Sequence, residues 1–361
     1  MKAILILEDG KIFEGVAFGS IKNEVYGEIV FNTSMSGYQE ILTDPSYKGQ
    51  FVVMTYPLIG NYGVNDDDNE SISSQVEGFV IKELCCYPSN FRSKKSLNEY
   101  FKEQDKMGIM DVDTRAITRH IRLQGAMKAG IFTNFNDVDS LVNKVKNSMD
   151  ITAKDMVKEL TCKEAFYWNQ TGKIKIAVLD CGVKYSILDN LKKRNCLVKV
   201  FPATIDVESI LDFNPDGIFL SNGPGDPKGA DYVYKTISKL LGKKPIFGIC
   251  LGHQMLGLAI GAQTYKLKFG HHGGNQPVKD LNTNKVSITA QNHNFCVDIE
   301  SLKAKDIKIT HINLNDKTIE GMESEELKFF SVQFHPEAGP GPNDATYLFD
   351  KFIDNINKNR K

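Results

Sequence analysis

Hydrophobic and polar residues follow two different rhythms along this chain. In residues 1–150, short apolar runs are separated by turn-forming residues, a pattern typical of β-strands. These runs predict strands at 3–7, 11–17, 28–31, 51–54 and 79–81. Helical periodicity follows at 96–104 and 114–123, and Asp113 is a suitable N-cap for the second helix. The segments 31–40, 43–47 and 56–63 are dense in small and polar residues and predict ordered loops.

From residue 174 onward, strand and helix patterns alternate. Strands are expected at 174–179, 197–201, 217–220 and 246–249, and helices at 184–194, 232–241 and from 251. This alternation predicts a parallel sheet with helices on both faces. Shorter strands follow at 263–267, 286–290, 307–311, 319–322 and 329–333, before a closing helix at 344–357.

The predicted fold class is therefore α/β. An N-terminal mixed β/α domain at 1–150 is expected to lead through a linker at 151–173 into a second domain at 174–361. We expect the second domain to be a doubly wound, mostly parallel sheet with an antiparallel β extension. Ligands of such sheets bind outside the carboxyl ends of the strands, so the residues that follow those strands are the first candidates for a site.

Composition adds mainly exclusions. The 361 residues are 41% hydrophobic and 25% charged, an ordinary balance for a globular protein. The formal net charge of −1 gives no electrostatic reason to expect a nucleic acid or an acidic membrane as a partner. Because no apolar run suits a membrane span or a signal peptide, we expect a cytoplasmic protein. The seven cysteines include no C-x-x-C pair, which argues against a disulfide framework or a zinc site.

The stretch 246–254 carries the most specific chemical signal in the chain. An apolar strand pattern ends just before Cys250, and an apolar helix pattern begins just after it. Gly248 and Gly252 stand two positions to either side, which is the spacing of a nucleophile elbow with cysteine as the nucleophile. A helix N-terminus favours a thiolate and offers free N–H groups to an oxyanion. A buried, inert cysteine is the alternative, and a general base is needed to decide.

His335 is the candidate for that base. It follows an apolar strand and precedes Pro336 and Glu337. Alternate residues of an extended segment face the same side, so Glu337 is spaced to accept a hydrogen bond from one ring nitrogen of His335. The other nitrogen is then left for a thiol. Since Cys250 and His335 both follow strands, one sheet edge can bring them together, and we predict a Cys250–His335–Glu337 triad.

The segment 221–227 supplies candidates for an oxyanion hole. It follows a strand and contains Gly223 and Gly225, which allow the backbone to approach a ligand closely. The N–H groups of Leu251 and Gly223 are the natural pair of donors. A dinucleotide-binding turn is the alternative, but Lys228 stands where a third glycine is needed. The chain also contains no G-x-x-x-x-G-K-[ST] motif for a nucleotide phosphate.

Three histidines, His271, His272 and His293, suggest a metal site at first sight. Neighbouring side chains of an extended chain point apart, and no thiolate or carboxylate spacing completes a tetrahedral set of ligands. We therefore expect no metal in this chain.

Residues 248–254 together with 335–337 resemble the class I, or triad, glutamine amidotransferases. Other segments are similar to the small subunits of carbamoyl phosphate synthase, and they are 31–40, 43–47, 56–61, 111–115, 180–184, 268–275 and 291–293. The similarity extends over essentially the whole chain. The N-terminal segments are not shared by other triad amidotransferases, so the resemblance is specific to this family.

The resemblance implies a glutaminase subunit of a glutamine-hydrolysing ligase (EC 6.3.5.5). Cys250 would attack the side-chain amide of L-glutamine to give a glutamyl thioester and ammonia, His335 would shuttle the proton, and Glu337 would orient His335. The glutamine-contacting positions of the family correspond to Ser46, Gly223, Gly225, Leu251, Gln254, Asn292, Asn294 and Phe295. Asn294 stands where the family usually has a small residue, commonly glycine.

The resemblance further implies a large subunit as the partner. Ammonia would travel to it by an enclosed path, and it would make carbamoyl phosphate from bicarbonate and ATP for arginine and pyrimidine synthesis. ATP and a divalent metal are expected on the large subunit, with no cofactor in this chain. The domain at 1–150 is expected to contact the large subunit and to contribute to the glutamine site. The alternatives are an amidotransferase subunit of another synthetase and a catalytically idle regulatory subunit.

Overall fold

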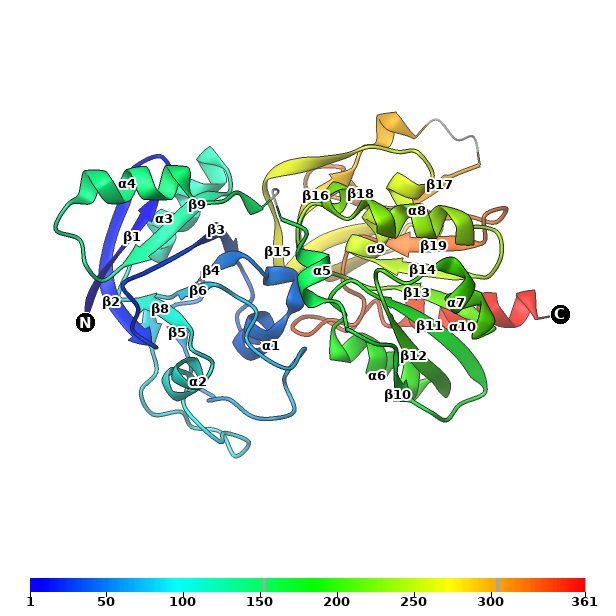
Figure 1. The fold of residues 1–361 in the computed structure, drawn as a ribbon, viewed down its shortest axis with the longest axis horizontal. Coiled ribbons are helices and arrows are strands. Elements are labelled where there is room, and N and C mark those ends of the chain that lie inside the picture. The colour runs from blue at the N-terminus through cyan, green and yellow to red at the C-terminus, as the bar shows by residue number, and fades with distance from the viewer. Residues whose placement is uncertain (152–153, 303–305, 361) are drawn as a thin grey trace. The chain divides into compact units, whose positions relative to one another are not determined.

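The computed structural model describes residues 1–151, 154–302 and 306–360 (Figure 1). By its contacts the chain divides into two compact units. The first comprises Met1–Lys154 together with Lys268–Gly273, and the second comprises Asp155–Leu267 together with Gly274–Lys361.

The first unit is built around a closed β-barrel that mixes parallel and antiparallel pairs. Its strands, in order around the barrel, are β1 (Lys2–Leu7), β2 (Ile12–Gly19), β8 (Met107–Met110), β6 (Gly78–Val80), β4 (Gln50–Met54), β3 (Glu24–Asn32) and β9 (Met127–Phe132). A separate ladder pairs β5 (Leu58–Ile59) with β7 (Glu83–Leu84). The helices are α1 (Tyr38–Thr43), α2 (Leu97–Glu103), α3 (Thr114–Gln124) and α4 (Val138–Asn147), and η1 (Pro45–Tyr47) is a short 3₁₀ turn. Closure of the barrel removes the open strand edges that a flat sheet would expose.

Side-chain caps explain where the predicted helices of this unit begin. The carboxylate of Asp113 accepts a hydrogen bond from the N–H of Ala116, so the N-cap expected for α3 is confirmed. Ser96 and Glu99 form a reciprocal capping box at the start of α2. These local signals are written in the sequence, which is why the two helix starts could be predicted.

The sequence pattern misses β8, β9 and α4, and it predicts a loop where α1 lies. A glycine in each of the two strands weakens its sequence pattern. A Cβ on Gly108 of β8 would lie 2.3 Å from the ring of Phe18, and one on Gly130 of β9 would lie 2.7 Å from the ring of Phe132. Close aromatic packing thus replaces residues of high β-propensity with glycine and weakens the strand signal.

The second unit contains a ten-stranded sheet within the described residues. Its strands, in spatial order, are β10 (Phe166–Asn169), β12 (Cys196–Pro202), β11 (Ile174–Asp180), β13 (Gly217–Leu220), β14 (Ile246–Ile249), β19 (Phe329–Val332), β18 (Ile319–Ser324), β17 (Lys308–Asn313), β15 (Thr264–Asp280) and β16 (Val286–Val297). The strands from β12 to β19 in this order pair in parallel. Antiparallel pairs continue the sheet on both sides, so the predicted parallel core with an antiparallel extension is confirmed.

Helices cover both faces of the parallel core. They are α5 (Met156–Leu160), α6 (Tyr185–Lys193), α7 (Val207–Asp212), α8 (Asp231–Leu240), α9 (Leu251–Ala259) and α10 (Tyr347–Asn359), with short 3₁₀ turns η3 (Pro227–Gly229) and η4 (Ile299–Ser301). α6 and α10 share a core with Ile176 and Val178 of β11, whereas α7, α8 and α9 share one with the alternate residues Ala177 and Leu179. Because alternate strand residues point to opposite faces, the sheet is doubly wound as expected.

Two elements lie in the segment 151–173 that the sequence predicts as a linker. They are α5 and the edge strand β10, which pairs antiparallel with β12. The indole N–H of Trp168 on β10 donates a hydrogen bond to Asp189 of α6. Within the ranges that the structure describes, no helix combines the length and the apolar character that a membrane span requires.

The carboxyl ends of the parallel strands meet at one edge of the sheet. Ile249 of β14 pairs with Val332 of β19, so Cys250 and Gln333 begin the segments that leave these neighbouring strands. β11 and β13 run parallel to them and end at the same edge. This edge therefore collects side chains from segments that are far apart in the sequence.

Candidate active site

The backbone at Cys250 has the strained geometry of a nucleophile elbow. Cys250 has φ 53° and ψ −104°, a left-handed φ that is uncommon for a residue with a side chain. The flanking glycines permit this turn. A Cβ on Gly248 would lie 2.8 Å from the carbonyl oxygen of Gly252, and one on Gly252 would lie 2.4 Å from the carbonyl oxygen of Leu220. The glycine spacing therefore reflects two close approaches between backbone segments.

Polar contacts link Lys184, Glu337 and His335. Nδ1 of His335 lies 2.6 Å from Oε1 of Glu337. The same oxygen accepts a hydrogen bond of 3.1 Å from Nζ of Lys184, which also donates to the carbonyl oxygen of Ala338. All three side chains are buried, and Lys184 is only 1% exposed. The buried carboxylate is thus held between an ammonium group and an imidazole.

These contacts shift the pKa values of His335 and of Glu337 in opposite directions. Burial by itself would lower the pKa of His335, but Glu337 and then Cys250 raise it to about 10. Burial by itself would raise the pKa of Glu337, but Lys184 and then His335 lower it to about 2. The arrangement therefore favours a protonated imidazole beside an ionised carboxylate.

Three groups act on the sulfur of Cys250. Sγ lies 3.6 Å from the carbonyl oxygen of Asn292, to which an S–H group can donate. Nε2 of Gln333 donates to Sγ over 3.7 Å. Cys250 and His335 also interact through charge and hydrogen bonding, and Nε2 of His335 has no other partner among the described residues. The carbonyl oxygen of Asn292 can thus accept a hydrogen bond from the thiol, whereas Gln333 and His335 can donate hydrogen bonds to the thiolate.

The start of α9 lies against the loop that carries Gly223. A Cβ on Gly223 would lie 2.2 Å from the carbonyl oxygen of Cys181 and 2.7 Å from Cδ2 of Leu251. Leu251 opens α9, and its N–H precedes the first intrahelical bond, which runs from the N–H of Gln254 to the carbonyl of Cys250. Gly223 therefore packs closely against the side chain of Leu251, the residue that directly follows Cys250.

Further residues predicted to bind glutamine lie on α9 and β16, around Cys250. Nε2 of Gln254 donates to the carbonyl oxygen of Phe295 over 2.7 Å and to Oε1 of Gln333 over 3.1 Å. The strand β16 carries three predicted residues within four positions, and all three are buried: Asn292, Asn294 and Phe295. This strand segment therefore contacts both Cys250 and Gln254, the side chain one helical turn after it.

Two residues predicted to bind glutamine, Gly225 and Ser46, lie beside Met156 and Asp44, respectively. Gly225 has φ 83°, and the nearest atoms to a Cβ there would belong to Met156 of α5, at 3.7 Å. Ser46 lies in the first unit on η1, where it is buried and its N–H donates to the carboxylate of Asp44.

Sequence reasoning missed Lys184 and Gln333. A signal for each was present. Lys184 ends the segment 180–184, which follows a predicted strand and so lies at the edge where ligands bind. Gln333 precedes His335 by two residues, so the same alternate spacing that singled out Glu337 applies to it.

Two of the histidines considered for a metal, His272 and His293, make contacts with neighbouring groups. In the second unit, Nδ1 of His293 lies 2.8 Å from the carbonyl oxygen of Phe295, and its Nε2 lies 3.0 Å from Oε1 of Gln291. In the first unit, the ring of His272 stacks on that of Tyr47, with centroids 6.0 Å apart. These contacts position both rings.

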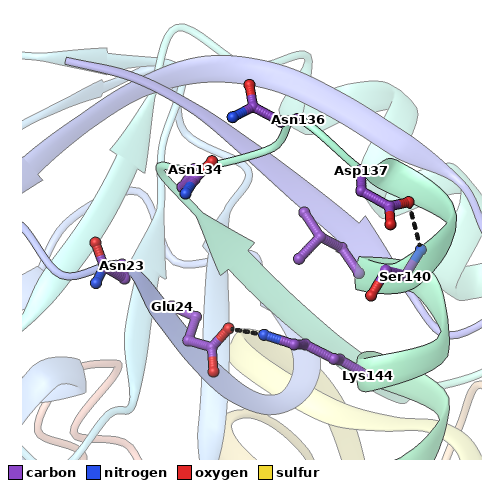
Figure 2. A pocket seen from close by; sticks show the side chains of 8 residues that line it. Asn23, Glu24, Asn134, Asn136, Asp137, Ser140 and Lys144 are labelled. Carbon is purple, nitrogen blue, oxygen red and sulfur yellow. Dashed lines mark hydrogen bonds and ion pairs between the residues drawn. The ribbon is translucent and has the colours of Figure 1, made fainter.

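Figure 2 shows a surface hollow of about 540 Å³ in the first unit. It is lined by Asn23, Glu24, Asn134, Asn136, Asp137, Ser140, Leu141 and Lys144. Its charged groups are satisfied by one another or by backbone: Lys144 pairs with Glu24 at 2.8 Å, and Asp137 caps α4 through the N–H of Ser140. Since neither a histidine nor a cysteine lines it, the hollow is no match for the chemistry that Cys250 indicates.

Comparison with known proteins defines the class of this site. Residues 177–355 match the family described as glutamine amidotransferase class-I. Residues 5–131 match the family described as carbamoyl-phosphate synthase small chain, CPSase domain. The part of the chain that contains Cys250, His335 and Glu337 is therefore a class I glutamine amidotransferase domain.

Proteins named carbamoyl phosphate synthase small chain are similar to this chain over almost their whole length. The chain is 53% identical to the one from Syntrophotalea carbinolica, covering 100% of this chain and 99% of that one, and 53% identical to the one from Aquifex aeolicus, covering 97% and 98%. It is 49% identical to the pyrimidine-specific small chain of Bacillus subtilis, covering 100% and 98%. The chain belongs to the carbamoyl phosphate synthase small chain family. It is thus a glutamine amidotransferase of the glutamine-hydrolysing carbamoyl phosphate synthase type, and the predicted α/β fold class is confirmed.

Proposed function

We propose that this chain hydrolyses L-glutamine through a Cys250–His335–Glu337 triad and supplies the ammonia to a carbamoyl phosphate synthase large subunit. One observation carries the proposal. Cys250, at a strained strand-to-helix junction, interacts with His335, and Nδ1 of His335 lies 2.6 Å from Glu337. This is the order of nucleophile, base and orienting carboxylate that covalent catalysis by a thiolate needs.

The reaction begins when the thiolate of Cys250 attacks the side-chain carbonyl carbon of glutamine. The electron pair of the C=O bond moves to oxygen, where the N–H groups of Leu251 and Gly223 bind it. Protonated His335 donates a proton to the amide nitrogen. The C–N bond then breaks, ammonia is released, and a glutamyl thioester remains on Cys250. Water that loses a proton to His335 then attacks the thioester. The C–S bond breaks, and glutamate and the thiolate are released.

The remaining family positions are proposed to bind the substrate. Gln254, Asn292 and Phe295 are supported by their contacts around Cys250 in the second unit. Asn294 belongs to the same buried stretch of β16. For Gly225 and for Ser46 of the first unit, the support is the correspondence with the family positions.

We propose the partner and pathway from the family. A small chain implies a large chain, which would hold ATP and a divalent metal, so that this chain needs no cofactor of its own. The N-terminal domain at 1–150 would contact that large chain, in the cytoplasm. Its carbamoyl phosphate would serve arginine and pyrimidine synthesis, and the Bacillus subtilis relative is named for the pyrimidine branch.

The test is to replace the nucleophile in the complex with a large subunit. Cys250→Ser is expected to lower glutamine-dependent carbamoyl phosphate synthesis by at least ~10³-fold, because a serine hydroxyl is a far weaker nucleophile than a thiolate without a matched base. Synthesis from added ammonia is expected to stay within about twofold, since that route bypasses the thiol. Measuring both rates in one preparation separates loss of chemistry from loss of assembly.

The matched control is Cys181→Ser, a second buried cysteine that directly follows a strand of the same sheet. It should retain glutamine-dependent activity within about threefold. If Cys250→Ser abolishes both activities, the residue is structural. If it changes neither, Cys250 is not the nucleophile and the triad proposal is wrong.

A further inference from the structure

Gln333 stands out among the buried polar groups that the triad mechanism leaves unused. Its side chain is fully buried at 0% exposure, directly after β19, and its own N–H donates to the carbonyl oxygen of Glu320. Its amide nitrogen lies 3.7 Å from Sγ of Cys250. A buried amide that is directed at a nucleophile needs an explanation beyond packing, because burying it has a free-energy cost.

Neighbouring groups fix which end of this amide faces the sulfur. The carbonyl oxygen of Phe295 can only accept, so the group that contacts it at 2.7 Å must be the NH₂ of Gln254. The same NH₂ lies 3.1 Å from the next amide, which must present its oxygen there. The NH₂ of Gln333 is thereby turned toward Cys250. The amide of Gln254 thus donates to both Phe295 and Gln333, and the amide of Gln333 donates to the sulfur.

An N–H donor at this position has an electrostatic consequence. A hydrogen bond to a charged acceptor is stronger than one to a neutral acceptor, so the amide stabilises the thiolate more than the thiol. The carbonyl oxygen of Asn292 acts in the opposite sense, because it accepts from S–H and repels a negative sulfur. Gln333 and Asn292 therefore favour different protonation states of Cys250.

We propose that Gln333 is a further catalytic residue, whose amide NH₂ holds the sulfur of Cys250 as a thiolate. The proposal rests on the glutaminase function proposed above and adds a group to it. The same hydrogen bond serves in both half-reactions. It stabilises the nucleophile before attack on glutamine, and it stabilises the thiolate that leaves when water breaks the C–S bond of the thioester.

The proposal is tested by the pH profile of thiol alkylation in the complex with a large subunit. The rate of Cys250 modification by iodoacetamide is followed by mass spectrometry from pH 6 to 10. Gln333→Met keeps the length of the side chain and removes the donor, and it should move the midpoint of the profile upward by about one pH unit. Glutaminase turnover at neutral pH should fall by about tenfold or more, with ammonia-dependent synthesis unchanged.

A second variant guards against simple misfolding. Gln333→Glu keeps the oxygen that accepts from Gln254 and places a carboxylate against the sulfur, so the midpoint should move at least as far upward. Gln276→Met is the matched control, because Gln276 accepts a hydrogen bond from Asn315 on the same unit and has no contact with Cys250. Its profile should coincide with that of the wild type.

The possible outcomes are distinct. A fall in turnover without a shifted midpoint in either Gln333 variant would mean a packing role and would overturn the proposal, as would an unchanged turnover. Failure of the glutaminase proposal itself gives another result. In that case the wild-type chain would show no modification of Cys250 by an electrophilic glutamine analogue, whatever occupies position 333.

Discussion

Cys181 and Cys250 begin from the same place in the fold and end in opposite environments. Each directly follows a strand of the parallel sheet, β11 and β14, and both are almost completely buried. After Cys181, the carboxylate of Asp180 accepts hydrogen bonds from the next two N–H groups of the turn. After Cys250, α9 begins at once. Position at a strand end is therefore shared and cannot by itself make a cysteine reactive.

The charges around the two thiols explain the difference. Burial, then Asp180 and Asp155, raise the pKa of Cys181, and no hydrogen-bond partner for its sulfur is found among the described residues. Cys250 instead faces the amide NH₂ of Gln333 and the imidazole of His335. A carboxylate neighbour disfavours a thiolate, whereas N–H donors and a cation favour it. What separates the two cysteines is thus their partners and not their burial.

The first prediction concerns the reactivity of these two thiols. In the native complex at pH 8, an electrophilic glutamine analogue should modify Cys250 at least ~10²-fold faster than Cys181, because only the thiolate reacts well. Peptide mapping after partial modification measures the ratio. Equal rates would mean that the partners described above do not control reactivity.

The second prediction removes Glu337, the carboxylate that we propose orients His335. Glu337→Gln should lower glutaminase turnover by ~10²–10⁴-fold, since His335 loses its anionic partner. It should also lower the free energy of unfolding by ~3–5 kcal/mol, because the ammonium group of Lys184 is left buried without its counter-charge. Urea unfolding and a glutaminase assay measure the two effects.

Adding Lys184→Met to Glu337→Gln separates stability from chemistry. The double variant should recover most of the lost unfolding free energy, because no buried charge remains, while turnover stays low. Recovery of turnover would mean that Glu337 acts only by neutralising Lys184.

The third prediction concerns the elbow. Gly252→Ala should lower the free energy of unfolding by ~1–3 kcal/mol and reduce turnover, because the new methyl group meets the backbone oxygen of Leu220 at 2.4 Å. Gly261→Ala is the control. Gly261 has φ 87° but open space around a Cβ, so only about 1 kcal/mol of backbone strain is expected, with normal turnover. Similar turnover in both variants would argue against the need for close approach at the elbow.

The last prediction concerns the pH dependence of stability. The pKa of His335 is about 10 in the folded chain and ~6.5 when unfolded, so the folded state binds more protons between these values. Its contribution is complete below pH ~6.5 and falls by ~1.4 kcal/mol per pH unit as pH rises through this interval. Urea unfolding at pH 6.5, 7.5 and 8.5 should show the wild type losing this advantage over His335→Asn. A constant difference would contradict the raised pKa.

Much of the fold could be predicted because its signals are local. The apolar runs of β11, β13 and β14 and the helices between them follow from periodicity, and the cap at Asp113 from residue type. β8 and β9 could not be predicted, since Gly108 is required by the ring of Phe18 on another strand and Gly130 by the ring of Phe132 on its own strand. The place of Lys268–Gly273 could not be predicted either. This segment belongs to the first unit, although the chain on both sides of it belongs to the second.

The sequence by itself determined the elbow at Cys250, and with it the proposed nucleophile, because the flanking glycines, the strand and the helix are neighbours in the chain. It also determined the spacing of His335 and Glu337, two residues apart. Only the tertiary structure decided which groups surround the sulfur and the carboxylate. Lys184 reaches Glu337 across 153 positions, and Gln333 reaches Cys250 across 83. Such pairs depend on the order of strands in the sheet, and that order follows from packing over the whole unit, so periodicity and residue type do not reveal it.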